Sequence, residues 1–275
     1  MILAAAREKP RWGYRRLQIV LDQTGEHVNH KRIYRVYREA GLMIGRRARK
    51  RLRREGSARP ALSGPNQEWA LDFVHDAAQS GRKFRALSVV DPYTRECLAL
   101  EVDTSMGSRR VTRVLEAILA ERGVPQAIRS DNGPEFTSRH FLAWCAERKI
   151  EVVHIEPGKP AQNAHVESFH GKLRDECLNA SWFANLFDAR RKIAAWRREY
   201  NEERPHSSLG YRTPAAFARE IGGRKGCGKD GGCATLDPGT LHRDPLSHRP
   251  GDGGQSLSGD IVKQQNRFGN EGSVV

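Results

Sequence analysis

The stretch IRSDNGPEF, residues 128–136, decides how the middle of the chain folds. Ile128 has the setting of a buried strand end, and Asp131 follows it closely before an Asn-Gly-Pro run that signals a turn. A turn is one explanation of Asp131, because Asp in this context often bonds its own backbone. The other explanation is a functional carboxylate at a strand tip, which requires further acids that converge on the same point.

The segments around this stretch alternate between strand and helix patterns. Their order, β-β-β-α-β-α-β-α, predicts an α/β domain with a mixed five-stranded sheet flanked by helices. The turn PYT (92–94) joins the second and third strands and predicts a hairpin. The expected strands are WALDFVHDA (69–77), KFRALSVVD (83–91), RECLALEVD (95–103), PQAIRSD (125–131) and IEVVHIE (150–156), and the expected helices are 108–123, 137–149 and 164–178.

Three acids in this region are candidates for one site. Asp72 lies inside an apolar strand, where a charge is costly unless something pairs with it. Asp131 lies just past the fourth strand, and Glu167 lies one turn into the helix that follows the fifth. Asp76, Glu135 and Asp175 are expected to be surface charges or caps instead. Such carboxylates suit Mg²⁺ or Mn²⁺, and two ions ~4 Å apart can clamp the oxygens of a phosphoryl displacement.

The charge of the chain is concentrated near its N-terminus. The formal net charge is +14, and residues 1–60 hold 17 Lys and Arg against 5 Asp and Glu. Such a basic segment indicates a polyanionic partner such as DNA or RNA.

Two short helices are expected within this basic segment, at about 11–24 and 30–40, and they fit a helix-turn-helix module. The second helix leaves a basic outer face, and the run at 45–56 can order along a DNA backbone. The alternative is a solvated basic helix in a bundle. The predicted DNA contacts here are Lys31, Arg32, Arg35, Arg46, Arg47, Lys50 and Arg51.

Several other classes of protein are disfavoured. The five Cys residues are odd in number and scattered, which is typical of a reduced intracellular protein, and no apolar run approaches the length of a membrane span. Residues 181–221 read as a helical extension, and the Gly-rich tail from residue 222 is expected to be disordered. A weak zinc alternative is offered in that tail by Cys227, Cys233, His242 and His248, whose spacings depart from the usual pattern.

Several of these stretches resemble one family. WALDFV (69–74), IRSDNGPEF and PGKPAQNAHVESFHGKLRDECL (157–178) are similar to the DDE transposases of bacterial insertion sequences, which are related to retroviral integrases. The chain resembles most narrowly the OrfB-type catalytic subunit of the IS-three family. Further support comes from VVDPYTRECLALEVD (89–103) and YNEERPHSSLGYRTPAAF (200–217), and from the N-terminal helical segment.

The resemblance implies an RNase H-like core at about 66–180 that cuts and joins DNA 3′ ends with two Mg²⁺ (or Mn²⁺) ions. It implies that Asp72, Asp131 and Glu167 form the metal-binding catalytic triad. It places Lys159, Gln162 and Asn163 in a loop that touches the DNA end, and it makes Arg174 a candidate phosphate contact.

The resemblance also implies partners and a location. The implied partners are the element's terminal repeats and target DNA, further copies of this chain in a homo-oligomer on DNA, and an OrfA partner or an OrfAB fusion. A cytoplasmic, nucleoid-associated protein without a membrane partner is expected. Two other classes stay open, namely a nuclease of the same fold that cuts without joining, and a non-catalytic, decayed DNA-binding remnant.

Overall fold

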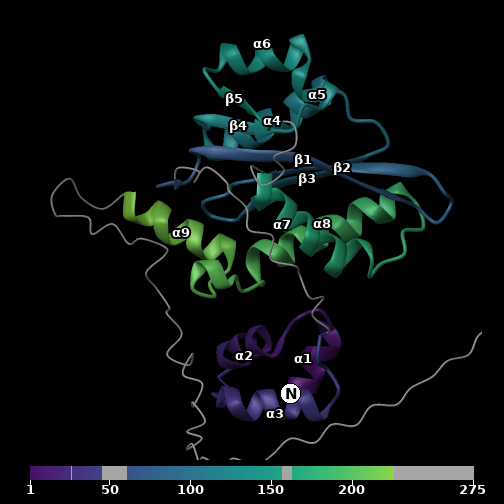
Figure 1. Ribbon diagram of the computed structural model, residues 1–275, viewed down its shortest axis with the longest axis vertical. Coiled ribbons are helices and arrows are strands. Elements are labelled where there is room, and N and C mark those ends of the chain that lie inside the picture. The colour runs from purple at the N-terminus through teal and green to yellow at the C-terminus, as the bar shows by residue number, and fades with distance from the viewer. Residues whose placement is uncertain (26, 45–60, 157–162, 226–275) are drawn as a thin grey trace, which may run out of the picture. The chain divides into compact units, whose positions relative to one another are not determined.

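The computed structural model describes residues 1–25, 27–44, 61–156 and 163–225 (Figure 1). A five-stranded sheet with the order β3-β2-β1-β4-β5 forms the centre of residues 61–225. Its strands are β1 (Glu68–Ala77), β2 (Lys83–Val90), β3 (Cys97–Asp103), β4 (Ala127–Ser130) and β5 (Glu151–His154). All five coincide with segments predicted from the sequence.

The sheet is mixed, as predicted. β1, β2 and β3 pair antiparallel, whereas β4 pairs parallel with β1 and with β5. The β2–β3 turn is held by the buried Asp91, whose Oδ1 accepts the N–H groups of Tyr93 and Thr94 at 2.8 and 3.2 Å. The carboxylate thus pairs backbone groups that the tight turn leaves without ladder partners. This turn confirms the expected hairpin.

Helices cover both faces of the sheet (Figure 1). On one face, α7, the turn η2 and α8 pack on β1, β2 and β3 through residues such as Phe169, Ile193 and Trp196. On the other face, α4, α5 and α6 pack through Leu115, Phe136 and Phe141. The helices are α4 (Ser108–Arg122), α5 (Pro134–Thr137), α6 (Arg139–Glu147), α7 (Ala164–Leu173), η2 (Arg174–Leu178), α8 (Leu186–Glu202), η3 (Ser207–Leu209) and α9 (Pro214–Lys225).

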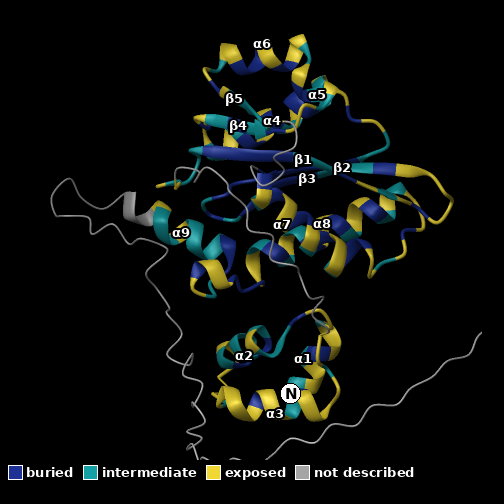
Figure 2. Ribbon diagram, in the orientation of Figure 1, coloured by how far each residue is buried: buried dark blue, intermediate teal, exposed yellow. Residues whose placement is uncertain are grey.

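Burial follows this layering (Figure 2). β1 and β2 are dark where they lie between the two helical layers and lighter toward the end at which they are joined, and β2 is buried throughout Ala86–Val90. A strand buried on both sides reads as a continuous apolar run. This is why ALSVV (86–90), the continuously buried part of β2, lacks the alternation of a half-exposed strand.

The structure differs from the sequence predictions in four local features. The turn after Asp131 is the start of the short helix α5, and the helix predicted over 164–178 changes at Arg174 into the π-helical turn η2. α9 continues to Lys225, past the predicted start of a disordered tail at residue 222. Glu135, expected as a surface charge or cap, is half-buried and pairs with Arg85 at 2.5 Å.

Residues 1–44 form three helices: α1 (Ile2–Glu8), α2 (Tyr14–Gln23) and α3 (His30–Glu39). Only α1 was not predicted. Asn29 caps α3 by accepting the Lys31 N–H at 2.9 Å, and Gly25 and Gly41 end α2 and α3 with φ of 87° and 68°. A small core that includes Leu17 and Tyr37 holds the three helices together.

Candidate active site

The register of β1 and β4 brings Asp72 and Asp131 level with each other. In this parallel pair, Ala70 lies opposite Arg129. Asp72 lies two residues after Ala70, and Asp131 lies two residues after Arg129 and one past the end of β4. Both therefore follow the last position at which β1 and β4 pair. Because side chains repeat every second residue and neighbouring strands run about 4.8 Å apart, both carboxylates emerge side by side on one face.

Glu167 comes to the same face on α7. The buried side of this helix consists of Val166, Phe169, His170 and Leu173, and Phe169 packs edge-on against Tyr200 and Trp196 at ring distances of 5.0 and 5.5 Å. These contacts fasten α7 to α8, and the buried side of α7 shares one core with Ala70 and Val74 of β1. Glu167 lies next to the buried stripe and is exposed.

The negative charges of Asp131 and Glu167 are close enough to Asp72 to interact with it electrostatically. Burial raises the pKa of Asp72 to about 6, and the negative charges of Asp131 and Glu167 contribute to the rise, although the N–H of Phe73 opposes it. That N–H donates to Asp72 Oδ1 at 2.7 Å. The sequence prediction that a charge at Asp72 is costly is therefore confirmed.

Replacing Asp72 with Asn should stabilise the protein at pH 8 without divalent cations. The folded-state pKa of Asp72 lies above its ordinary value of 3.8, so the wild type loses stability as the pH rises through about 4 to 6. A rise of about two pKa units corresponds to roughly 3 kcal/mol at most, and an amide carries no charge to desolvate. Thermal denaturation in EDTA should show a higher midpoint for Asp72→Asn at pH 8 and no gain near pH 3.5; a lower midpoint at pH 8 would contradict this.

Asp131 also plays the local role that its sequence suggested. Its Oδ1 accepts the backbone N–H of Gly133 at 3.1 Å, so the turn explanation describes a real contact. A Cβ at Gly133 would come within 3.1 Å of this oxygen and 3.2 Å of Glu135 Oε2. The close approach thus favours glycine, and the turn holds the exposed Asp131 at the strand end beside Asp72.

The donor chemistry of this site fits a hard divalent cation. Three carboxylates offer oxygen ligands, and a cation would offset the repulsion that helps to raise the Asp72 pKa. Within residues 1–25, 27–44, 61–156 and 163–225, no three Asp, Glu, His or Cys side chains stand close enough to form a ready-made metal site. The acids are neighbours without forming a closed cage, which suits Mg²⁺ because it retains waters and shares substrate phosphates.

Sequence reasoning missed two buried polar residues beside Asp72. His170 on α7 and Ser88 on β2 are 9% and 0% exposed, and His170 Nε2 lies 2.6 Å from Ser88 Oγ. Burial lowers the pKa of His170 to about 4, with Arg174 adding to the effect, so the ring is neutral at pH 7. The available signal was the position of His170 on the apolar stripe of α7, where an apolar residue is expected.

Some of the predicted DNA contacts lie in the described residues and the others lie outside them. Lys31, Arg32 and Arg35 are exposed on α3 while Ile33 and Tyr37 face the small core, which agrees with the expected basic outer face. Arg174 is exposed at the start of η2. Asn163, which the resemblance places in the loop that touches the DNA end, is buried. The contacts predicted at Arg46, Arg47, Lys50, Arg51, Lys159 and Gln162 lie outside the described residues, as do the cysteines and histidines of the zinc alternative.

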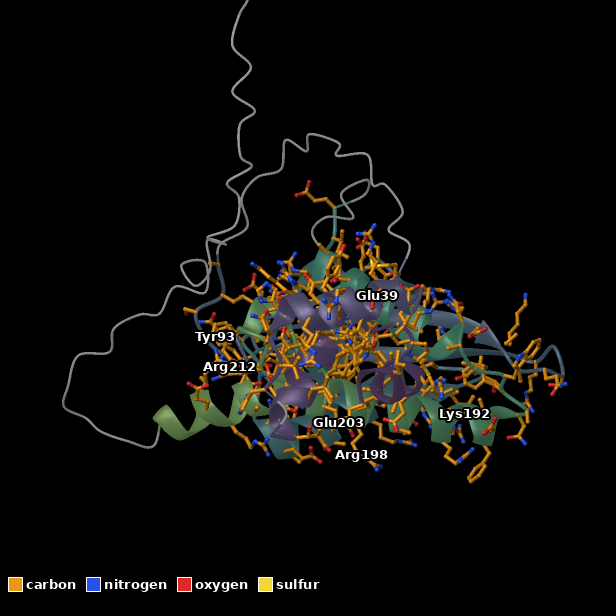
Figure 3. All side chains as sticks on the ribbon, turned by 90° about the horizontal axis from the view of Figure 1, so that it is seen from below. Glu39, Tyr93, Lys192, Arg198, Glu203 and Arg212 are labelled. Carbon is orange, nitrogen blue, oxygen red and sulfur yellow. The ribbon has the colours of Figure 1, made fainter. Side chains whose placement is uncertain are left out.

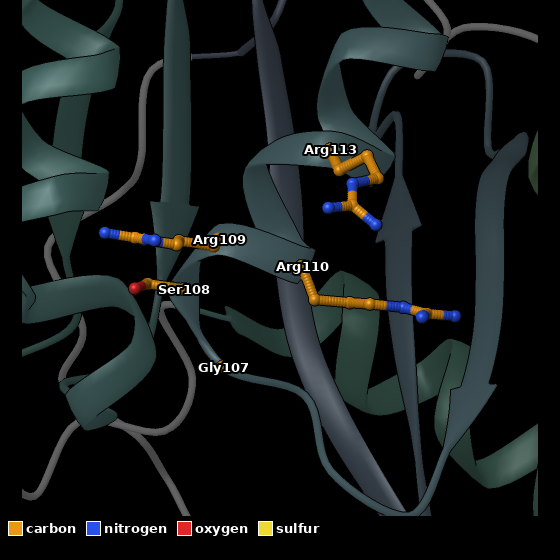
Figure 4. A pocket seen from close by; sticks show the side chains of 5 residues that line it. All are labelled: Gly107, Ser108, Arg109, Arg110 and Arg113. Carbon is orange, nitrogen blue, oxygen red and sulfur yellow. The ribbon is translucent and has the colours of Figure 1, made fainter.

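A shallow basic hollow of about 440 Å³ lies at the start of α4 (Figure 4). Gly107, Ser108, Arg109, Arg110 and Arg113 line it, and the three guanidinium groups point in different directions. Arg110 is already paired with Glu101 and Asp103 at 2.8 and 3.1 Å. The hollow adds basic surface but does not gather its charges on one point.

Three family models match the chain in tandem. An HTH-like domain matches residues 2–51, and two integrase core domain models match residues 63–160 and 148–214. The integrase core models therefore span both the sheet and α8. Among the described residues, no helix is long and apolar enough to cross a bilayer.

Relatives over most of the chain come from insertion elements. The chain is 47% identical over 220 residues to an uncharacterized 31.7 kDa protein of insertion element IS407 from Burkholderia multivorans, covering 79% of each. It is 48% identical over 219 residues to an uncharacterized 39.2 kDa protein of IS476 from Xanthomonas euvesicatoria, covering 79% of this chain and 63% of that protein. It is 26% identical to the IS2 transposase InsD from Escherichia coli, covering 78% and 75%.

The fold is similar to that of a solved integrase assembly. A cryo-EM structure of the simian T-cell lymphotropic virus intasome, in complex with the PP2A regulatory subunit B56 gamma, gives a TM-score of 0.51 at 17% identity, covering 73% of this chain and 70% of that chain. At this identity the likeness supports the RNase H-like, integrase-type fold alone. With the relatives above, it confirms the resemblance seen in the sequence: the chain belongs to the IS-three family of insertion-sequence DDE transposases, which are polynucleotidyl transferases with an integrase core.

Proposed function

We propose that this protein catalyses cleavage at the 3′ ends of an insertion sequence and joins those ends to target DNA, with Asp72, Asp131 and Glu167 as the catalytic acids. One observation supports this most. Asp72, inside β1, comes level with Asp131, just past the end of the parallel strand β4, and Glu167 lies on α7, near enough for both acids to help raise the pKa of Asp72. Active sites of open α/β sheets form at such strand ends.

Asp72, Asp131 and Glu167 are also the proposed ligands of two Mg²⁺ or Mn²⁺ ions. When bound, such ions activate the attacking oxygen and stabilise the leaving oxygen of an in-line phosphoryl displacement. The role of the protein is to present carboxylate oxygens on rigid elements, a strand end and a packed helix. The basic N-terminal segment, which holds most of the net positive charge, can bind the DNA backbone, so the acidic centre does not have to attract it.

The proposed reaction has two steps without a covalent enzyme intermediate. A water attacks the phosphodiester at the element end, the bond to the 3′ oxygen breaks, and a 3′-hydroxyl is released. That hydroxyl then attacks a phosphodiester of the target, forming one P–O bond as another breaks. A labelled element end incubated with target DNA should yield joined product; cleaved ends without joining would instead indicate a nuclease of the same fold.

The exposed face of α3 is the proposed DNA-binding surface of the HTH-like domain. Replacing Lys31, Arg32 and Arg35 together with Ala should weaken DNA binding and reduce the slope of log K against log salt by up to about 3, because each lost phosphate contact contributes about 0.9. Fluorescence anisotropy at several salt concentrations measures this slope. Arg198→Ala, on the exposed side of α8 (Figure 3), is the control outside this domain; an unchanged slope in the triple variant would contradict the assignment.

Further parts of the proposal concern the organisation of the chain. We assign residues 1–60 to a DNA-binding segment and linker, 66–180 to the catalytic core, 181–221 to a C-terminal extension and 222–275 to a tail. α8, from the extension, packs on the same core as β1 and α7. The proposed partners are the terminal repeats, target DNA, further copies of this chain on DNA and OrfA, or an OrfAB fusion, acting at the nucleoid in the cytoplasm.

A further inference from the structure

A buried pair of polar side chains links the helix of Glu167 to the strand of Asp72. Ser88 lies directly opposite Asp72 in the β1–β2 ladder, and its Oγ is 3.0 Å from the Asp72 carbonyl oxygen and 2.6 Å from His170 Nε2. The other ring nitrogen of His170, Nδ1, faces Asp72 Oδ2 at 3.5 Å. A single imidazole thus touches the β2 hydroxyl and the Asp72 carboxylate.

The contact to Asp72, rather than the contact to Ser88, assigns the tautomer of His170. With the ring proton on Nε2, Ser88 Oγ accepts from Nε2 and donates to the Asp72 carbonyl oxygen; with the proton on Nδ1, Ser88 donates to Nε2. The first arrangement sets the lone pair of Nδ1 against a negative oxygen, which is repulsive. This repulsion favours the second arrangement, in which the Nδ1 proton points toward the carboxylate.

We infer that His170, held by Ser88, is a positioning residue that orients the carboxylate of Asp72 for cation binding. Oδ1 of Asp72 is anchored by the Phe73 N–H at 2.7 Å, so the ring controls the remaining oxygen. At 3.5 Å the contact is longer than a hydrogen bond, so it orients Oδ2 and leaves its lone pairs available for a ligand. His170 also lies three residues after Glu167, so the same anchor fixes the helix that carries the third acid. The inference rests on the proposed role of the triad.

Three substitutions of His170 separate its two contacts. His170→Asn keeps an N–H near the position of Nδ1, His170→Gln reaches toward Ser88 but loses the contact to Asp72, and His170→Leu keeps neither. Mn²⁺ binding to the full chain, followed by electron paramagnetic resonance of free Mn²⁺, should weaken about 10- to 100-fold in His170→Leu and His170→Gln, as for other residues that orient metal ligands. His170→Asn should stay within about threefold of wild type, and Ser88→Ala should weaken binding about tenfold.

Two controls make the result decisive. Asp72→Asn should lose both Mn²⁺ binding and DNA joining, and retention of both would overturn the proposed function itself. His140→Leu removes a different histidine–hydroxyl contact, from Nε2 to Thr112 Oγ1 at 3.0 Å between α6 and α4, and should leave Mn²⁺ binding unchanged.

The remaining outcomes test the inference alone. Suppose that Asp72→Asn loses Mn²⁺ binding and DNA joining, while folded His170→Leu binds Mn²⁺ like wild type. The proposed catalytic triad is then supported, and the positioning role of His170 is wrong. If thermal denaturation shows His170→Leu unfolded, His170→Gln and His170→Asn decide: equal affinities in these two variants would overturn the inference.

Discussion

Amide replacement of any one of Asp72, Asp131 and Glu167 should abolish strand joining. Asp72→Asn, Asp131→Asn and Glu167→Gln change size very little but remove the negative oxygen that a divalent cation requires. Cation catalysis is worth several kcal/mol of transition-state stabilisation, and each 1.4 kcal/mol is tenfold in rate, so a loss on the order of 10³-fold or more is expected. Joining of a labelled terminal repeat in Mg²⁺ measures it.

DNA binding should survive these substitutions, because the proposed DNA-binding residues are the positively charged ones on α3. The substitutions leave those residues unchanged. A matched control lies on the same strand: Asp76 Oδ1 accepts the N–H of Ala77 at 2.8 Å, just as Asp72 Oδ1 accepts that of Phe73 at 2.7 Å. Asp76→Asn therefore removes a charge with the same local bonding and should join DNA normally. Near-normal joining by any of the three triad variants would contradict the assignment.

The sheet was predictable because its signals are local. Each strand is a short apolar run bounded by turn residues, such as PYT between β2 and β3. Helix boundaries are marked in the same local way, by Gly123 at the end of α4 and Asn29 at the start of α3. The order of the strands in space is not a local property, since β1 lies between β2 and β4 only after long-range pairing. The positions of Asp72, Asp131 and Glu167 in the sequence suggested a site. Whether these acids lie close together depends on the spatial order of the strands.

The polar support of the site could not be predicted from the sequence. Ser88 reads as one residue of an apolar strand, and its meaning depends on the register that sets it opposite Asp72. The Arg85–Glu135 pair joins residues far apart in sequence, so Glu135 looked like a surface charge. The π-helical turn Arg174–Leu178 contains neither Gly nor Pro, so no helix-breaking residue marked it in the sequence.

The second large effect is expected at Arg204, a buried arginine paired with Glu176. Its Nε donates to both Glu176 oxygens, at 3.1 and 2.8 Å, and its Nη2 also donates to Glu176. The two side chains are 3% and 9% exposed. Glu176 lies in η2, directly after α7, whereas Arg204 follows α8, so the pair fastens these two elements together. This gives a physical reason for the arginine within YNEERPHSS.

Arg204→Met should destabilise the protein by about 3–5 kcal/mol, because it leaves the Glu176 carboxylate buried without its cation. For a folded region of this size that loss lowers the thermal midpoint by roughly 10 °C. Arg191→Met is the exposed counterpart: its pair with Asp188 at 3.1 Å has Arg191 68% exposed, so its loss should cost less than about 1 kcal/mol.

The double variant Glu176→Leu/Arg204→Met separates the charge effect from the packing effect. Removing both charges removes the uncompensated carboxylate, so the double variant should recover most of the lost stability. If it is as unstable as Arg204→Met, the fit of the guanidinium against Tyr200, at 5.9 Å from the ring, matters more than its charge. If neither variant is destabilised, the buried pair does not hold η2 to the end of α8.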